Sequence, residues 1–235
     1  MRGWWREIVD LVLPVDCAGC GRTRSALCAR CLARLCGAEG TQRVRPSPEP
    51  AGLPAVYAAG AYEDELRAVL LAHKERGALR LAEPLGAALA AAVRAGIHAA
   101  GPGGRRRDEP VLLVPVPSAR SATAARGHDP ARRMALCAAR QLRREGIPAR
   151  VLAVLRQRRS VVDQVGLSAT QRVENLSGAL RAAPGSGRLL GAGATVVVDD
   201  VMTTGASLVE AARAVAAAGG SVAAAAVVAA SSCDC

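Results

Sequence analysis

The sequence predicts an α/β fold, a parallel sheet flanked by helices, preceded by a small cysteine-rich module. Short apolar runs alternate with longer alanine-rich segments from about residue 55 to the end of the chain. These runs are almost continuously apolar, which is typical of strands buried on both faces of a parallel sheet. The composition agrees, because 51% of the 235 residues are apolar and can fill one main core.

Two CxxC pairs mark the N-terminal module, residues 1–36. The pairs are separated by seven residues, and each can hold one edge of a metal ion from a tight turn. Four thiolates favour zinc in a structural role, since they leave no open position for a substrate. Redox-active or unrelated thiols are the alternative. The expected ligands are Cys17, Cys20, Cys28 and Cys31.

A short amphipathic helix from Trp4 to Leu13, stopped by Pro14, is expected before these cysteines. Charged residues interrupt the apolar start of the chain, so neither a signal peptide nor a membrane span is predicted, and the cytoplasm is the expected location. Four prolines within residues 37–54 indicate a linker to the main domain, residues 55–235.

Strands and helices are expected to alternate in the main domain. Its strands are predicted at residues 56–62, 111–117, 151–155, 195–198 and 222–230. Its helices are predicted at residues 63–77, 79–95, 129–146 and 207–218. The third helix carries a clear start signal, with Asp129 as N-cap and Pro130 at the first helical position.

The charge is strongly basic, with 31 lysines and arginines against 20 acidic residues and a net charge of +11. Such a surface favours anionic partners, including phosphates and single-stranded DNA, although the bias toward arginine can equally come from genome composition. Aromatic residues make up only 2% of the chain, which argues against base stacking as the mode of binding. Lys74 is the only lysine.

The stretch TVVVDDVMTTGAS, residues 195–207, carries the strongest functional signal. The predicted strand ends at Val198, so Asp199 and Asp200 are expected at the carboxyl edge of the sheet, where ligands bind in open parallel sheets. The small residues that follow lead into a helix, whose first N–H groups can bind a phosphate. Two carboxylates beside such a turn suit a sugar phosphate with bound Mg²⁺. A P-loop is excluded, because its lysine is missing here.

This stretch closely resembles the binding motif for phosphoribosyl diphosphate (PRPP) in type I phosphoribosyltransferases. Residues 112–135, 156–180 and 71–77, together with the CxxC pairs, resemble the ComF family of competence-associated phosphoribosyltransferase-like proteins. The resemblance runs from about Leu11 to Ala230 and implies the type I phosphoribosyltransferase fold for the main domain. One departure is visible. The family usually has an aromatic residue and Asn after Arg-Gly, where this chain has His128 and Asp129.

The resemblance also implies roles for individual residues. Asp199 and Asp200 would bind the ribose hydroxyls and form the catalytic pair. The turn that would bind the 5′-phosphate consists of Thr203, Thr204, Gly205, Ala206 and Ser207. The diphosphate would lie near Val116, Pro117 and Ser118, with Lys74, Arg126 and Arg172 as candidate cationic partners.

The implied function is transfer of the phosphoribosyl group from PRPP, with Mg²⁺, to an unidentified acceptor, in association with DNA uptake. Such a glycosyltransferase needs no conspicuous nucleophile, because positioning and stabilisation of the leaving diphosphate do most of the work. The alternative is a non-catalytic PRPP- or nucleotide-binding accessory protein that docks to DNA-uptake or recombination partners of the competence machinery.

Overall fold

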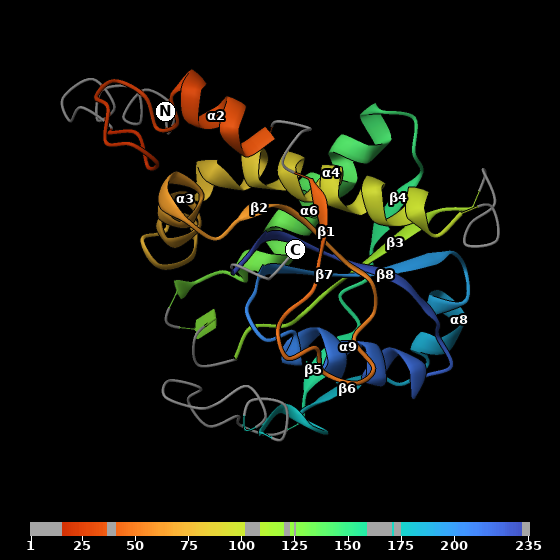
Figure 1. Ribbon diagram of the computed structural model, residues 1–235. Helices are drawn as coiled ribbons and strands as arrows, with labels where there is room; N and C mark the ends of the chain where they lie inside the picture. The colour runs from red at the N-terminus through yellow and green to blue at the C-terminus, as the bar shows by residue number, and fades with distance from the viewer. Residues whose placement is uncertain are drawn as a thin grey trace, which may run out of the picture.

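The computed structural model of the chain describes residues 16–36, 41–101, 109–119, 123, 124, 126–158, 171 and 175–231. These residues form a mostly parallel six-stranded sheet with helices on both faces, as the sequence predicts (Figure 1). The helix expected at residues 4–13 lies outside the described residues, as does Arg172.

The six strands lie in the order β1-β2-β8-β7-β3-β4, and only the edge strand β1 runs antiparallel to its neighbour. Their bounds are β1 Gln42–Val44, β2 Val56–Ala61, β8 Val222–Ala230, β7 Ala194–Met202, β3 Val111–Pro115 and β4 Ala149–Val151. All five residues of β3 and the last seven of β8 are buried. The central strands are therefore covered on both faces, which explains their uninterrupted apolar sequences.

The helices divide between the two faces of the sheet (Figure 1). Their bounds are α2 Ala29–Cys36, α3 Asp64–Glu75, η2 Leu79–Leu81, α4 Ala82–Ala99, α6 Pro130–Arg144, α8 Ser186–Leu190 and α9 Ala206–Ala216. Alternation along β7 separates two cores: Val196 and Val198 pack with α4 and α6, whereas Val197 packs with α9.

Helices α4 and α6 cross closely at Gly86. A Cβ atom at this position would lie 2.3 Å from Cys137 Cβ and 3.0 Å from the backbone N of Ala138. The alanine-rich sequences of both helices, with this glycine at the crossing, let the two backbones approach and close the core on that face.

Most predicted elements of the main domain are present, with shifted ends. The helix expected at 79–95 begins as the 3₁₀ turn η2 and continues as α4 to Ala99. Helix α6 begins as predicted: Pro130 opens it, and the Asp129 carboxylate accepts a hydrogen bond from Arg132 N at 3.0 Å. The predicted N-cap at Asp129 is therefore confirmed.

The single strand predicted at 151–155 is wrong. Strand β4 ends at Val151, and a separate strand β5, Leu155–Gln157, begins four residues later. Strand β5 leaves the main sheet and pairs antiparallel with β6, Leu180–Ala182. Apolar sequence continues through this corner because Val154 and Leu155 stay buried against the α9 face.

The segment predicted as a linker, residues 37–54, contributes to the main sheet. Within it, β1 pairs antiparallel with β2, with Gln42 opposite Ala58 and Val44 opposite Val56. Val44 is buried in the core that faces α9. Part of this proline-rich segment thus belongs structurally to the main domain.

The cysteine-rich module packs against the main domain through α2. Leu35 enters the core that contains α4, and the guanidinium groups of Arg30 and Arg34 both contact the Glu65 carboxylate on α3. Among the described residues, no helix combines the length and apolar character that crossing a membrane requires.

Candidate functional site

The end of β7 positions the two adjacent aspartates. The sequence predicts that this strand stops at Val198, but it continues to Met202. Pairing with β3 ends where Pro115 lies opposite Val198, whereas pairing with β8 goes on until Met202 lies opposite Ala230. Asp199 and Asp200 therefore lie beyond the end of one neighbouring strand and beside the other, on a rigid backbone at the carboxyl edge of the sheet.

Backbone N–H groups hold both carboxylates. Asp200 N donates to Asp199 Oδ1 at 2.8 Å, and Val201 N donates to Asp200 Oδ1 at 2.8 Å. Asp200 is buried, and Asp199 is half-buried. Since Val198 faces the core that contains α4, strand alternation directs Asp200 toward that side and Asp199 toward the side of α9. The two adjacent carboxylates thus serve different sides of the sheet edge.

Lys74, the only lysine of the chain, reaches this edge from the last turn of α3. Its Nζ lies 2.6 Å from Asp200 Oδ2. The sequence names both residues as candidates but not as partners, and the structure brings them together across more than a hundred residues. The ion pair uses Oδ2 of Asp200, while the other oxygen, Oδ1, accepts the hydrogen bond from Val201 N.

The electrostatics of this edge are coupled. Burial raises the pKa of Asp199 well above its ordinary value of 3.8, and the Asp200 charge raises it further. Burial alone would lower the pKa of Lys74, but the Asp200 carboxylate and the nearby Asp199 charge more than offset it and raise this pKa. The raised pKa of Asp199 favours the protonated form of that carboxyl group, and the raised pKa of Lys74 keeps its ammonium group charged.

The turn after β7 leads directly into α9. Gly205 precedes the helix with φ +76°, and a Cβ atom there would lie 2.9 Å from Leu53 Cδ1. Both the left-handed backbone and the contact favour glycine. Thr203 is exposed, Thr204 and Ser207 are half-buried, and Gly205 has no side chain to cap the helix. The first-turn N–H groups of α9 thus lie beside small hydroxyl side chains, an arrangement able to bind an anion.

The end of β3 lies beside the aspartates. Val116 N donates to Val198 O at 2.9 Å, and the Val116 side chain is buried in the core facing α9. Pro117 and Ser118 follow and are half-buried. Of the three residues predicted to lie near a diphosphate, Val116 thus offers backbone only.

Arg126 forms an ion pair with Glu75, a residue that no sequence motif marked. Its Nε and one terminal nitrogen donate to the two Glu75 oxygens at 2.9 Å each. Glu75 directly follows Lys74 on α3. The end of this helix therefore bears one candidate cation, Lys74, and binds the other, Arg126, through Glu75. The role of Arg126 toward a diphosphate stays a prediction.

Two histidines form a buried pair behind Lys74. His73 is 1% exposed and His128 is 9% exposed, and their ring centroids lie 5.6 Å apart. Burial lowers the pKa of His73, and the Arg133 guanidinium acts in the same direction. The helix spacing could have indicated that His73 is buried, because this residue follows the apolar Val69 by four positions and so lies on the same face of α3.

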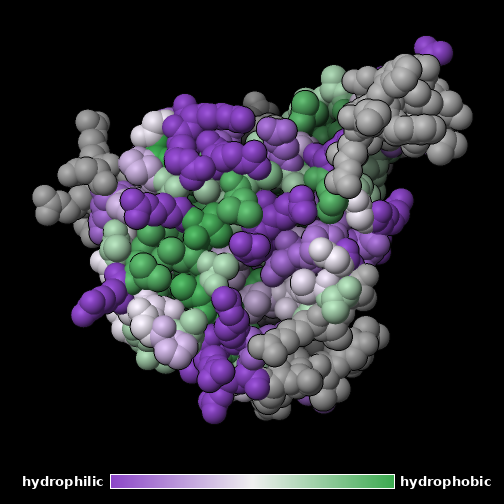
Figure 2. Space-filling model, turned by 180° about the vertical axis from the view of Figure 1, so that it is seen from behind, coloured by the Kyte–Doolittle hydropathy of each residue, from purple (hydrophilic) through white to green (hydrophobic). Residues whose placement is uncertain are grey.

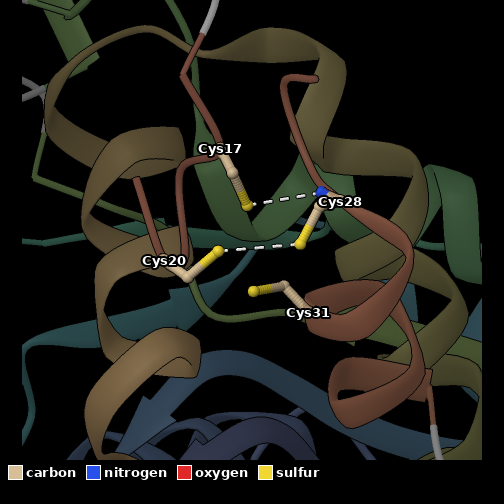
Figure 3. A group of neighbouring side chains, drawn as sticks. All are labelled: Cys17, Cys20, Cys28 and Cys31. Carbon is tan, nitrogen blue, oxygen red and sulfur yellow. Dashed lines mark hydrogen bonds between the residues drawn. The ribbon is translucent and has the colours of Figure 1, made fainter. Parts of the chain in front are cut away.

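The four cysteines converge as predicted. Their sulfur atoms all lie within 4.8 Å of one another, and Figure 3 shows the four side chains pointing toward a common centre. Cys20 Sγ lies 3.6 Å from Cys28 Sγ. A tetrahedral zinc ion with bonds of about 2.3 Å separates its sulfur ligands by about 3.8 Å, so the donor set fits such an ion.

Backbone N–H groups point at these sulfurs, as Cys28 N donates to Cys17 Sγ at 3.3 Å. Burial acts to raise the pKa of Cys17, but N–H groups of Cys20, Cys28 and Gly19 outweigh it and lower the pKa to about 6. Burial raises the pKa of Cys31 instead, and its sulfur neighbours add to the effect. The lowered pKa of Cys17 favours its thiolate, which is the form of cysteine that binds a metal.

Figure 2, which shows the side opposite to Figure 1, has hydrophilic side chains in separate groups around a hydrophobic patch. Binding of single-stranded DNA by a basic surface stays a prediction.

The edge of the sheet combines carboxylates, one lysine, one arginine and a helix start, which can together bind a polyhydroxylated anion. Scans with protein-family models and a search of curated proteins found no match to this chain. The functional assignment therefore depends on this geometry and on the motif at residues 195–207.

Proposed function

We propose that this chain is a phosphoribosyltransferase-like protein of the ComF family, with a type I phosphoribosyltransferase fold, and that it transfers a phosphoribosyl group from PRPP to an acceptor. The observation that supports this most is the meeting of Lys74 and Asp200, 2.6 Å apart, beside Asp199 and the turn into α9. Three segments distant in the sequence converge on the one stretch that resembles a PRPP motif.

Each part of PRPP has a chemically matched group at this edge. Carboxylate oxygens of Asp199 and Asp200 would accept hydrogen bonds from the ribose hydroxyls. The N–H groups and hydroxyls at residues 203–207 would bind the 5′-phosphate at the start of α9. Lys74 and Arg126 would offset the charge of the diphosphate, and Mg²⁺ bound with PRPP would neutralise part of it.

In the proposed reaction, the acceptor's lone pair forms a bond to C1 of the ribose while the bond from C1 to the diphosphate oxygen breaks. The electron pair of the broken bond leaves with the diphosphate, and the acceptor's proton passes to solvent. Positive charge develops on the ribose ring in between. An ionised Asp199 or Asp200 beside the ring would stabilise it.

Lys74 and Arg126 are already paired with Asp200 and Glu75, so PRPP would have to compete with these carboxylates. This competition suits a conformational change on binding. It also keeps a second candidate open, an accessory protein that binds PRPP or a nucleotide without turnover. The cysteine module favours that candidate, since it packs on the same helix α3 and offers a docking surface to DNA-uptake or recombination partners.

The test is diphosphate release from PRPP with Mg²⁺ and a panel of nucleobases and amines, alongside calorimetric titration of PRPP. Asp200→Asn should abolish both PRPP binding and release. The matched control is Asp129→Asn, because asparagine caps a helix as well as aspartate does. Release that D200N abolishes and D129N retains supports the enzyme. Binding without release for any acceptor supports the accessory protein, and absence of PRPP binding contradicts both.

A further inference from the structure

A groove between the start of α4 and the N-terminal half of α6 is lined by arginines. Its volume is about 490 Å³, within the range of small-molecule sites. None of its lining residues belongs to the set predicted to bind PRPP. The charged side chains in its lining are the arginines Arg80, Arg132, Arg133 and Arg140 and the acidic residues Glu83 and Asp129, and His128 also lines it.

Two of these guanidinium groups have no counterion among the described residues. Within the described part of the chain, neither Arg132 nor Arg133 forms an ion pair, whereas Arg94 and Arg213 elsewhere each hold a carboxylate. Asp129, the acidic residue closest in sequence, uses its carboxylate to cap α6 through Arg132 N. Arg133 is half-buried, and a partly buried charge without a partner is costly unless an anion offsets it.

Other polar groups of the groove also have incomplete partners. Among the described residues, Arg140 contacts the weak acceptor Cys137 Sγ, at 3.3 Å. His128 has its Nδ1 3.1 Å from Arg126 O, and its Nε2 is buried without a hydrogen-bond partner among the described residues. The arginines in the lining of this solvent-accessible cavity thus outnumber its two carboxylates, Glu83 and Asp129.

We propose that this groove is a second ligand site, specific for a small polyphosphate such as the di- or triphosphate group of a nucleotide. Guanidinium groups bind phosphate oxygens in a bidentate manner, and several of them in one cavity match a chain of phosphates better than a single monoanion. The lining holds no tyrosine or tryptophan on which a base could stack, so recognition falls on the phosphates. This site is independent of the proposed transferase activity.

Isothermal titration of inorganic triphosphate into the purified chain, at constant ionic strength, tests the proposal. Arg132→Gln/Arg133→Gln should weaken binding about tenfold or more, because it removes charge-assisted hydrogen bonds. The matched control is Arg150→Gln/Arg188→Gln, which removes the same charge elsewhere. Both control arginines are exposed and lie outside the lining of the groove. Arg150 lies on β4 between Ala149 and Val151, which face the α4 side. Arg188 lies on α8, which packs through Leu190 on the α9 side. The control should change the affinity less than about twofold.

Further variants and ligands distinguish binding in the groove from binding at the PRPP edge. Asp200→Asn should leave triphosphate affinity unchanged, and a change of affinity in this variant, in either direction, would place the ligand at the PRPP edge and overturn the proposal. If R132Q/R133Q fails to fold, as judged by circular dichroism, Arg140→Gln alone should weaken binding about threefold. Equal affinity for adenosine triphosphate and inorganic triphosphate would assign recognition to the phosphates. Absence of binding, or equal losses in both double variants, would refute the site.

Discussion

The cysteine cluster and the carboxyl edge of the sheet are two candidate sites of opposite construction. The four cysteines lie within fifteen residues of sequence, and their sulfurs converge within 4.8 Å. The sheet edge instead combines residues from α3, from the end of β7 and from the segment before α6. A local site can be recognised from spacing alone, whereas a site assembled from distant segments shows only its individual parts in the sequence.

The same contrast extends to the charges. Backbone N–H groups of neighbouring residues stabilise the Cys17 thiolate and lower its pKa to about 6. At the sheet edge, by contrast, Lys74 from a distant part of the sequence forms an ion pair with Asp200, and burial raises the pKa of Asp199. The cysteine cluster should therefore respond to changes in its own segment, and the sheet edge to changes far away in the chain.

The largest effect is expected from Cys28→Ser. Cys28 Sγ is one of the four converging sulfurs and lies 3.6 Å from Cys20 Sγ, so this substitution removes one of the four thiolate donors. Zinc content, measured by atomic emission, should fall from about one ion per chain to near zero, since structural sites contribute about 10–16 kcal/mol of apparent binding free energy. Cys137→Ser on α6 is the control and should keep its zinc. A C28S protein with full zinc content would contradict the four-cysteine assignment.

A smaller loss is expected from Lys74→Gln, which leaves the buried Asp200 carboxylate without its partner. Lys74 is 36% exposed, so solvent reduces the loss, and the free energy of unfolding should decrease by about 2 kcal/mol. The double variant Lys74→Gln/Asp200→Asn should recover part of it, because the unpaired charge is gone. Urea denaturation of both single variants and the double variant measures this coupling. Purely additive losses would show that the pair is unimportant for stability.

Gly205→Ala tests the turn before α9. Its strained φ of +76° and the contact with Leu53 should together cost about 1.5 kcal/mol. Gly146→Ala is a matched control, since Gly146 has φ +78° but no atom within 4 Å of the added Cβ. The difference between the two unfolding free energies isolates the contact that joins residues 37–54 to this turn. Equal losses would mean that Leu53 simply moves away.

The smallest effect has the opposite sign. Because burial raises the pKa of Asp199 in the folded state, ionising it costs stability as the pH rises from 3.8 through the raised value. Asp199→Asn removes this cost and should increase the free energy of unfolding at neutral pH by about 1 kcal/mol. The gain should disappear as the pH falls and Asp199 becomes protonated. Denaturant titrations at several pH values measure it, and a variant less stable than the parent at neutral pH would refute the raised pKa.

Sequence patterns predicted the general architecture well. Apolar runs located β2, β3, β7 and β8, and Asp129 with Pro130 located the start of α6, because these signals act over a few residues. Boundaries were less accurate where pairing partners decide them. β7 passes Val198 because β8 continues beside it, and the run at 151–155 is divided because β5 turns away to pair with β6.

Local spacing sufficed for the cysteine cluster and for the turn at residues 203–207 that leads into α9, since both depend on neighbours along the chain. Anion binding by this turn stays a prediction. Tertiary packing alone decided that Lys74 meets Asp200, that Arg126 meets Glu75 and that His73 lies beside His128. It also decided that Arg132 and Arg133 border a groove without an ion pair to any described residue. These pairings depend on how α3, α4 and α6 pack against the sheet. The free energy of that packing is distributed over many apolar contacts, so no short motif encodes it.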